Sequence, residues 1–267
     1  MSAFATIEIG IDPMIRLGPL TLAWHGLTIA IGVLIGGLYA GREARSRGLE
    51  AEPLQVMGLI LIAGAIIGSK LFYLAEHGGL TDPAAWVDDR GFTFYGGFIA
   101  VALGLAAYVW RRGLSVEYLD AIALGLPLGY GIGRIGDVIN GEHYGPATTF
   151  FLGVRNTHPD ADVPSNAVAY HSGGLYEMLI GFATFAVAVA LHRRLRGRRT
   201  AMVWLVIALL GVGRFLEFFV RSDSETGAFG LETAQWTSVA LVAVAAAGAW
   251  LTARRSSDVR PDALGRR

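Results

Sequence analysis

Residues 129–145 read GYGIGRIGDVINGEHYG, and GIGRIG (131–136) has the G-x-G-x-x-G spacing of a dinucleotide-binding loop. In such a loop a strand runs into the glycines and a helix begins after them. Here the glycines end the apolar run Leu119–Gly136, which contains Pro127, and no βαβ unit fits around it. The stretch therefore predicts the end of a membrane-spanning helix. Glycines let helices approach closely in lipid, and we expect such packing at Gly125, Gly129 and Gly133.

The composition agrees with a membrane protein. The chain has 267 residues, is 53% hydrophobic and 16% charged, and has a mean hydropathy of +0.48. A helix needs about 20 apolar residues to cross the bilayer. Seven segments qualify: Leu17–Ala40, Pro53–Ala75, Phe92–Trp110, Leu119–Gly136, Gly173–Leu191, Ala201–Val220 and Ala234–Ala253. We expect an all-α integral membrane protein in which residues 1–267 form a single polytopic domain of about seven transmembrane helices.

The chain contains no cysteine, which excludes disulfides, thiolate metal ligands and a cysteine nucleophile of its own. No basic start precedes a short apolar stretch near the N-terminus, so we expect no cleavable signal peptide.

Positive charge is distributed unevenly among the loops, although the formal net charge is zero. Most arginines follow the first, third, fifth and seventh segments: Arg42, Arg45, Arg47, Arg111, Arg112, Arg193, Arg194, Arg196, Arg198, Arg199, Arg254, Arg255, Arg260, Arg266 and Arg267. The positive-inside rule then predicts an outer N-terminus and a cytoplasmic C-terminus. Residues 137–172, between helices four and five, lie outside as a small extracytoplasmic cap or as a loose loop.

With this orientation, the polar residues near the helix ends all fall in the outer half of the membrane. They are His25, Lys70, Tyr73, Tyr95, Arg134, Asp137, Asn140, Glu142, His171, Tyr176, Glu177, Arg214 and Glu217. Arg134 and Arg214 are the most informative, because two guanidinium groups at membrane depth suit an anionic phospholipid headgroup. The alternative is internal pairing, of Arg134 with Asp137 and of Arg214 with Glu217. Both arrangements can hold together.

The other polar residues are weaker candidates. His25 could accept a proton, although a histidine beside Trp24 is also typical of an interfacial belt. Glu177 lies about one turn inside the fifth helix, where we expect it to have a structural partner. His143 and His158 are expected to be loop residues. No helical spacing of histidines supports a metal site, and we predict none.

Several motifs together resemble the bacterial prolipoprotein diacylglyceryl transferase family. GRIGDVINGEHYG resembles the family signature G-R-x-G-N-F-x-N-x-E-x-x-G, and GSKLFYL resembles its G-G-R-x-x-Y stretch. FTFYGG, LYEML and GVGRFLEFFVR resemble the F-H-G-G, L-Y-E and G-R-F-x-x-E-x-x-R motifs, and LGPLTLAWHGL resembles the N-terminal segment. The order and spacing of the motifs agree along nearly the whole chain.

The resemblance implies an enzyme of the bacterial plasma membrane. It would transfer the diacylglyceryl group of phosphatidylglycerol to the lipobox cysteine of a prolipoprotein at the outer leaflet, and release glycerol phosphate. The implied partners are phosphatidylglycerol, the prolipoprotein signal peptide and membrane lipids. We expect a monomer that uses no cofactor and binds no nucleic acid. The alternatives are a phospholipid-binding or lipid-moving protein without catalysis, and a related transferase with a different acceptor.

The resemblance and the residue chemistry together suggest roles for the site residues. Arg134, Arg214, His25, Tyr95 and Glu217 are the expected catalytic residues, with His25 as the proton acceptor. Asp137, Asn140, Glu142, Gly145, Lys70, His171 and Tyr176 are the expected substrate-binding residues. The chain also departs from the family pattern. His25 stands at a usual Tyr, Tyr95 at a usual His, Asp137 at the signature Asn and Lys70 at an Arg, while Glu217 follows Arg214 by three positions instead of four.

Overall fold

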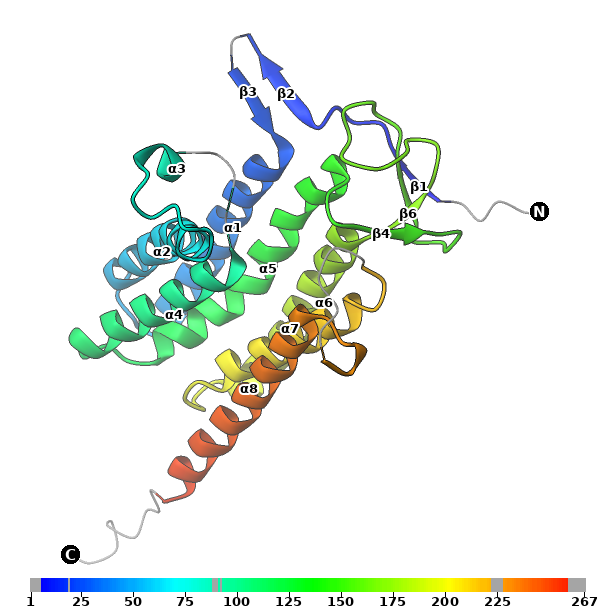
Figure 1. Cartoon of the computed structure of the whole chain (residues 1–267). Coiled ribbons are helices and arrows are strands. Elements are labelled where there is room, and N and C mark those ends of the chain that lie inside the picture. The colour runs from blue at the N-terminus through cyan, green and yellow to red at the C-terminus, as the bar shows by residue number, and fades with distance from the viewer. Residues whose placement is uncertain (1–5, 19, 88–90, 92, 222–227, 259–267) are drawn as a thin grey trace, which may run out of the picture. The chain divides into compact units, whose positions relative to one another are not determined.

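The computed structural model describes residues 6–18, 20–87, 91, 93–221 and 228–258, and within them the fold is mostly helical (Figure 1). The long helices are α1 (Trp24–Ser46), α2 (Glu52–His77), α4 (Phe94–Arg111), α5 (Glu117–Asn140), α6 (Gly173–Leu195), α7 (Ala201–Glu217) and α8 (Thr233–Asp258). A short helix α3 (Pro83–Val87) and a 3-10 turn η1 (Ala228–Gly230) complete the helical elements described. Each of the seven predicted segments therefore contains a helix.

Five of these helices are long and apolar enough to cross a membrane: α1, α2, α5, α6 and, over Thr233–Arg254, α8. The apolar part of α4 spans Gly96–Arg111, and α7 has 17 residues. Both are shorter than the roughly 20 residues that a helix perpendicular to the bilayer requires. The protein is thus a helical integral membrane protein with five candidate spans among the described residues.

The first predicted segment, Leu17–Ala40, is wrong at its start. Strands β2 (Met14–Leu17) and β3 (Leu20–Ala23) pair antiparallel, and α1 begins only at Trp24. Gly18 has a φ of +61°, a left-handed conformation that glycine adopts without strain, and this allows the chain to reverse. The hairpin runs directly into α1 (Figure 1).

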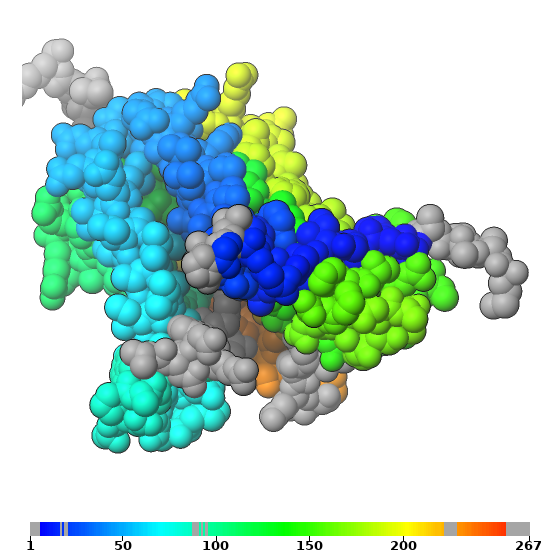
Figure 2. All heavy atoms as spheres, turned by 90° about the horizontal axis from the view of Figure 1, so that it is seen from above, coloured from blue at the N-terminus to red at the C-terminus, as the bar shows by residue number. Residues whose placement is uncertain are grey.

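The predicted start of the segment 137–172 is also wrong, because α5 continues to Asn140. Beyond that residue the segment contains β4 (Tyr144–Ala147), β5 (Val154–Asn156) and β6 (Tyr170–Ser172). With β1 (Ile7–Ile9) these strands form a sheet in the order β1-β5-β6-β4, in which β1 runs parallel to β5. Figure 2 shows the N-terminal segment, in blue, lying along the green residues of this sheet. The sequence left open whether this segment is folded or a loose loop, and in the structure it is folded.

The side chain of Asn156 attaches this sheet to the end of α5. Its Nδ2 donates to the carbonyl oxygens of Val138 and Ile139 at 2.9 and 3.0 Å. These carbonyls belong to the last turn of the helix, where backbone acceptors have no intrahelical donor. The contact therefore holds the sheet at the end of α5 that carries the signature motif.

The chain consists of two compact units. The first comprises residues 1–40 and 119–267, and the second comprises residues 41–118. In the second unit α2 packs closely on α4. Gly68 and Gly96 allow this approach, because a side chain at either position would overlap the backbone of the other helix. Lys70 is buried in this unit.

In the first unit, α1 and α5 pack through glycines, which confirms the predicted role of Gly125 and Gly129. A Cβ added to Gly129 would lie 2.6 Å from the carbonyl oxygen of Gly32, and one added to Gly125 would overlap the carbonyl of Gly36. Gly133 faces Ile29, where an added Cβ would make ordinary contact at 3.5 Å. Small residues at these positions allow the two backbones to approach.

This packing gives a first prediction. Gly129→Ala is expected to lower the free energy of unfolding by about 1–3 kcal/mol, because overpacking forces the two backbones apart. Gly133→Ala is the matched control and is expected to be neutral or slightly stabilising, since alanine favours a helix over glycine by about 1 kcal/mol. Thermal unfolding in detergent measures both. Equal stabilities of the two variants would contradict the close approach at Gly129.

Candidate active site

The polar ends of α1, α5, α6 and α7 contribute one continuous network of charged side chains in the first unit. It consists of His25, Arg134, Asp137, Glu142, Glu177, Arg214, Glu217 and Arg221. The sequence predicted that most of these residues converge, and the structure confirms it for those in this unit.

Glu177 lies at the centre of the network, on the first turns of α6, with its side chain 1% exposed. Arg134 Nε lies 2.6 Å from its Oε2. Arg214 Nη1 donates to its Oε1, and Arg221 Nη1 approaches the same oxygen at 3.4 Å. One buried carboxylate thus holds three guanidinium groups. The expectation that Glu177 has a structural partner is confirmed, although its central position was not predicted.

Asp137 connects this centre with α1. Arg134 Nη1 donates to its Oδ2 at 2.5 Å, which is the internal pair considered from the sequence. On the other side, the Nδ1 of His25 is hydrogen-bonded to Asp137 Oδ1 and lies 3.2 Å from Glu142 Oε2. The carboxylate of Asp137 therefore positions an arginine and a histidine at the same time.

Glu142 follows the end of α5 and closes this side of the network. Asn140 Nδ2 donates to its Oε1 at 2.8 Å. Burial acts to raise the pKa of the Glu142 carboxyl, but the hydrogen bonds from His25 and Asn140 outweigh it and hold the pKa below its usual value. Glu142 is therefore ionised at neutral pH.

Arg221 is the residue of the network that was not among the predicted site residues, although it ends the GVGRFLEFFVR motif. Its Nη1 lies 3.1 Å from Glu217 Oε1, and its Nη2 donates to His143 Nδ1 at 2.8 Å. The i, i+4 spacing of Glu217 and Arg221 was the available signal. His143, expected to be a plain loop residue, is thus part of the site. Arg214, for which a pair with Glu217 was considered, has Glu177 as its closest recorded partner.

The three arginines differ in exposure. The side chains of Arg134 and Arg214 are 20% and 23% exposed, whereas that of Arg221 is 7% exposed. Arg134 and Arg214 are therefore the more accessible arginines, while Arg221 is enclosed by its protein partners. A planar guanidinium binds a phosphate through two parallel N–H groups.

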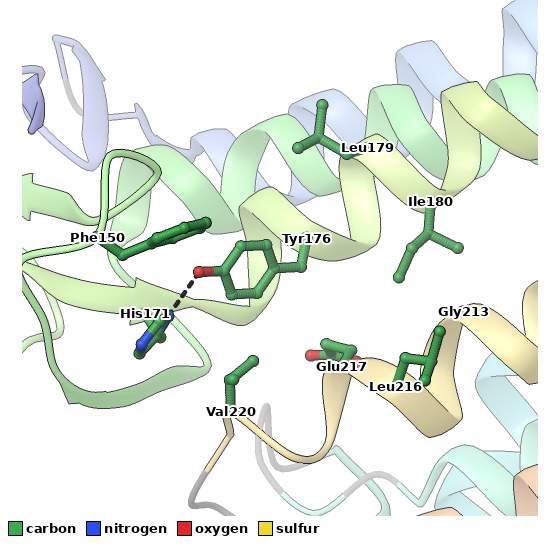
Figure 3. Close-up of a pocket in the computed structure, with 9 residues that line it drawn as sticks. All are labelled: Phe150, His171, Tyr176, Leu179, Ile180, Gly213, Leu216, Glu217 and Val220. Carbon is green, nitrogen blue, oxygen red and sulfur yellow. Dashed lines mark hydrogen bonds between the residues drawn. The ribbon is translucent and has the colours of Figure 1, made fainter.

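A cavity of about 520 Å³ lies beside the network, between α6, α7 and the loop that carries Phe150 (Figure 3). Its apolar wall is formed by Phe150, Leu179, Ile180, Leu216 and Val220. Its polar groups are His171, Tyr176 and Glu217. The Nδ1 of His171 is hydrogen-bonded to the Tyr176 hydroxyl at 2.6 Å, as the dashed line in Figure 3 marks. Glu217 lies at the cavity and also pairs with Arg221, and so links the two parts of the site.

The remaining predicted site residues lie at different places. Gly145 is in β4, where any side chain would overlap the carbonyl of Val220, so a glycine lets the sheet lie against the chain after α7. Lys70 lies in α2 and Tyr95 in the first turn of α4, both in the second unit. The side chain of Tyr95 lies outside the described part of the chain.

Two groups of described side chains have the donor types of a metal site. They are His25 with Asp137 and Glu142, and Asp12 with His158 and Asp160. In the first group Arg134 already neutralises Asp137, and in the second Arg16 pairs with both aspartates. In both groups the carboxylates therefore have arginine partners.

Comparison with known proteins identifies the family. The model of the family described as prolipoprotein diacylglyceryl transferase matches residues 13–251.

The chain belongs to this family.

Curated relatives named phosphatidylglycerol--prolipoprotein diacylglyceryl transferase agree. The relative from Geobacillus kaustophilus is 35% identical over 93% of this chain and 96% of its own length. Relatives from Solidesulfovibrio magneticus and Frankia alni are 33% and 30% identical, over 92% and 96% of this chain and over 96% and 69% of their own lengths.

Two of the residues at which the chain departs from the family motifs contact each other in the structure. His25 replaces a usual Tyr and Asp137 replaces the signature Asn, and these two side chains are hydrogen-bonded to each other. An imidazole and a carboxylate thus join the first helix to the signature motif in this chain.

Proposed function

We propose that this chain transfers the diacylglyceryl group of phosphatidylglycerol to the cysteine thiol of a prolipoprotein and releases glycerol phosphate. The observation that carries the proposal is the pair of partly exposed arginines, Arg134 and Arg214, held on the single buried carboxylate of Glu177. Family membership supplies the reaction class. The reaction as written requires no cofactor.

The two arginines bind the phosphodiester of the lipid. Their donors offset its negative charge and stabilise the charge that develops on the departing phosphate oxygen. The substrate thiolate attacks the glycerol carbon, a carbon–sulfur bond forms, and the carbon–oxygen bond to phosphate breaks with its electron pair on the oxygen. The site holds the arginines in place before the substrate arrives, because Glu177 and Asp137 already orient them.

The surrounding polar residues hold the arginines and the headgroup. Asp137 orients Arg134, Asn140 orients Glu142, and Glu142 offers an acceptor to the glycerol hydroxyls, while Glu217 holds Arg221. His25 and His171 are the two histidines available to take the proton of the attacking thiol.

The membrane arrangement follows the charge distribution. Seven helices span the bacterial plasma membrane, with the N-terminus outside, the C-terminus in the cytoplasm and the site toward the outer leaflet. The folded segment after α5 is the extracytoplasmic cap, and residues 1–267 act as one monomeric domain. The arginines after alternate spans and the position of the charged network at the opposite helix ends support this arrangement.

The direct test is transfer to a peptide. Purified protein is incubated with phosphatidylglycerol and a signal peptide that carries a lipobox cysteine, and the peptide is analysed by mass spectrometry. We expect a mass increase of one diacylglyceryl group, and none with a cysteine-to-serine peptide. Absence of the adduct under conditions in which a family relative forms it would overturn the proposal.

A second candidate function is phospholipid binding without transfer, which the His25 and Asp137 replacements motivate. In the same assay it predicts retention of phosphatidylglycerol by the protein with no modified peptide. Under this alternative Arg134→Ala would reduce lipid binding, and neither the wild type nor the variant would show transfer activity.

A further inference from the structure

We propose that His171, connected through the Tyr176 hydroxyl, is the proton acceptor for the substrate thiol, and that the cavity beside it receives the apolar, cysteine-bearing segment of the acceptor protein. This inference rests on the proposed transfer reaction. It adds the identity of the base and the location of the second substrate.

The position of the pair supports the assignment. His171 lies in β6 and Tyr176 in the first turn of α6, and both line the cavity of about 520 Å³ (Figure 3). The 2.6 Å hydrogen bond between Nδ1 and the phenol oxygen connects the cavity to the imidazole. Neither side chain has a recorded ion pair in the described part of the chain.

The partners of the two candidate histidines differ. The Nδ1 of His25 is engaged by the carboxylates of Asp137 and Glu142, so this ring is committed to the ion-pair network. The partner of His171 is a neutral hydroxyl. An imidazole in a weakly polar cavity stays uncharged more readily than it would in water, and only the uncharged ring can take a proton.

Burial lowers the pKa of the His171 imidazole below its usual value near 6.5. The titratable groups that line the cavity with it are Tyr176 and Glu217. At pH 7 the imidazole is therefore mostly neutral and competent as a base. This direction of the shift agrees with the role that the geometry assigns.

The shape and chemistry of the cavity favour a peptide over an acyl chain. Its wall is apolar on the side of Leu179, Ile180 and Leu216, which suits the small apolar side chains around an acceptor cysteine. An acyl chain would make no use of the polar groups. Glu217 is buried at the wall of the cavity, and its Oε2 has no hydrogen-bond partner among the described residues.

The cavity is also connected with the phosphate site. Glu217 pairs with Arg221, and Arg221 and Arg214 share Glu177. A thiol in the cavity is thereby brought next to a lipid phosphate bound by the arginines. In the reaction the thiol proton passes to the Tyr176 oxygen while the Tyr176 proton passes to His171 Nδ1. The thiolate then displaces glycerol phosphate, and the imidazolium later releases its proton to solvent.

The experiment compares His171→Gln, Tyr176→Phe and His25→Gln in lipid nanodiscs that contain phosphatidylglycerol, with kcat measured for a lipobox peptide from pH 5 to 9. His171→Gln is expected to lose about 100-fold in kcat at pH 7, the usual contribution of a general base. Its activity should recover as pH approaches about 8.5, where the thiol ionises by itself. The wild type should show an acid limb below about pH 6.5, because protonation removes the neutral base.

The variants keep the inference falsifiable. Tyr176→Phe should lose at least about tenfold in kcat with an unchanged KM for phosphatidylglycerol. His25→Gln should retain the acid limb, and His192→Gln, at the other end of α6, is the control expected to behave as wild type. If His25→Gln abolishes the acid limb, or if His171→Gln changes only the KM for the lipid, the assignment is overturned. Absence of transfer by the wild type would instead reject the proposed function.

Discussion

Glu177→Gln is expected to abolish at least about 99% of transfer activity and to destabilise the protein by about 3–5 kcal/mol. Three guanidinium groups contact this one carboxylate, and loss of its charge leaves them near one another with only Asp137 and Glu217 as negative partners. The amide keeps the size of the side chain, so the effect reports charge and not volume. Transfer to a lipobox peptide and thermal unfolding in detergent are the two measurements.

The matched control is Asp120→Asn, because Asp120 is a second buried carboxylate of the same unit. It accepts hydrogen bonds from the backbone N–H groups of Thr200, Met202 and Val203 at the start of α7. Its loss should lower stability, as the loss of a helix cap does, while kcat at a permissive temperature changes less than about threefold. If Glu177→Gln behaves in the same way, Glu177 is only a structural residue.

Arg134→Lys and Arg214→Lys are each expected to lower kcat/KM by about 100-fold, equivalent to about 2.8 kcal/mol of transition-state stabilisation. Lysine keeps the charge but lacks the planar pair of N–H groups that matches a phosphate. Both arginines are partly exposed. Peptide transfer as a function of lipid concentration measures the effect.

Arg221→Lys provides the comparison within the same network. Because Arg221 is enclosed by Glu217, Glu177 and His143, its substitution should reduce stability more than it reduces kcat/KM. A larger loss of kcat/KM in Arg221→Lys than in Arg134→Lys would contradict the division between ligand-binding and structural arginines. Near-normal rates in all three variants would argue against bidentate phosphate binding.

The positions of the helices were predictable because a membrane span is a local property of the chain. About 20 consecutive apolar residues suffice to identify one, and each of the seven segments contains a helix. The error at Leu17–Ala40 has a local cause as well. Gly18 lies between two apolar runs of similar hydropathy, and hydropathy alone does not distinguish a hairpin strand from the start of a helix.

The sequence predicted that the charged site residues lie close together, but it did not predict which of them form ion pairs. Orientation from the arginines predicted that Arg134, Asp137 and Arg214 share one side of the membrane. It could not reveal that Glu177 is the common partner, because α5, α6 and α7 determine that contact by their rotation and depth. Arg221 was missed for the same reason, because the sequence around an arginine beyond a helix end does not show whether its side chain is buried or exposed.

The sequence by itself determined the class of protein, the sites of its helices and, through the signature motif, the family. These properties depend on residues that are neighbours along the chain and on their solubility in lipid. Only the tertiary structure decided that His25 contacts Asp137, that one carboxylate holds three arginines, and that His171 and Tyr176 line a cavity beside them. The contacts of Asp137 with His25 and of Glu177 with the arginines join residues more than 30 positions apart, and they form only when helix packing brings specific faces together.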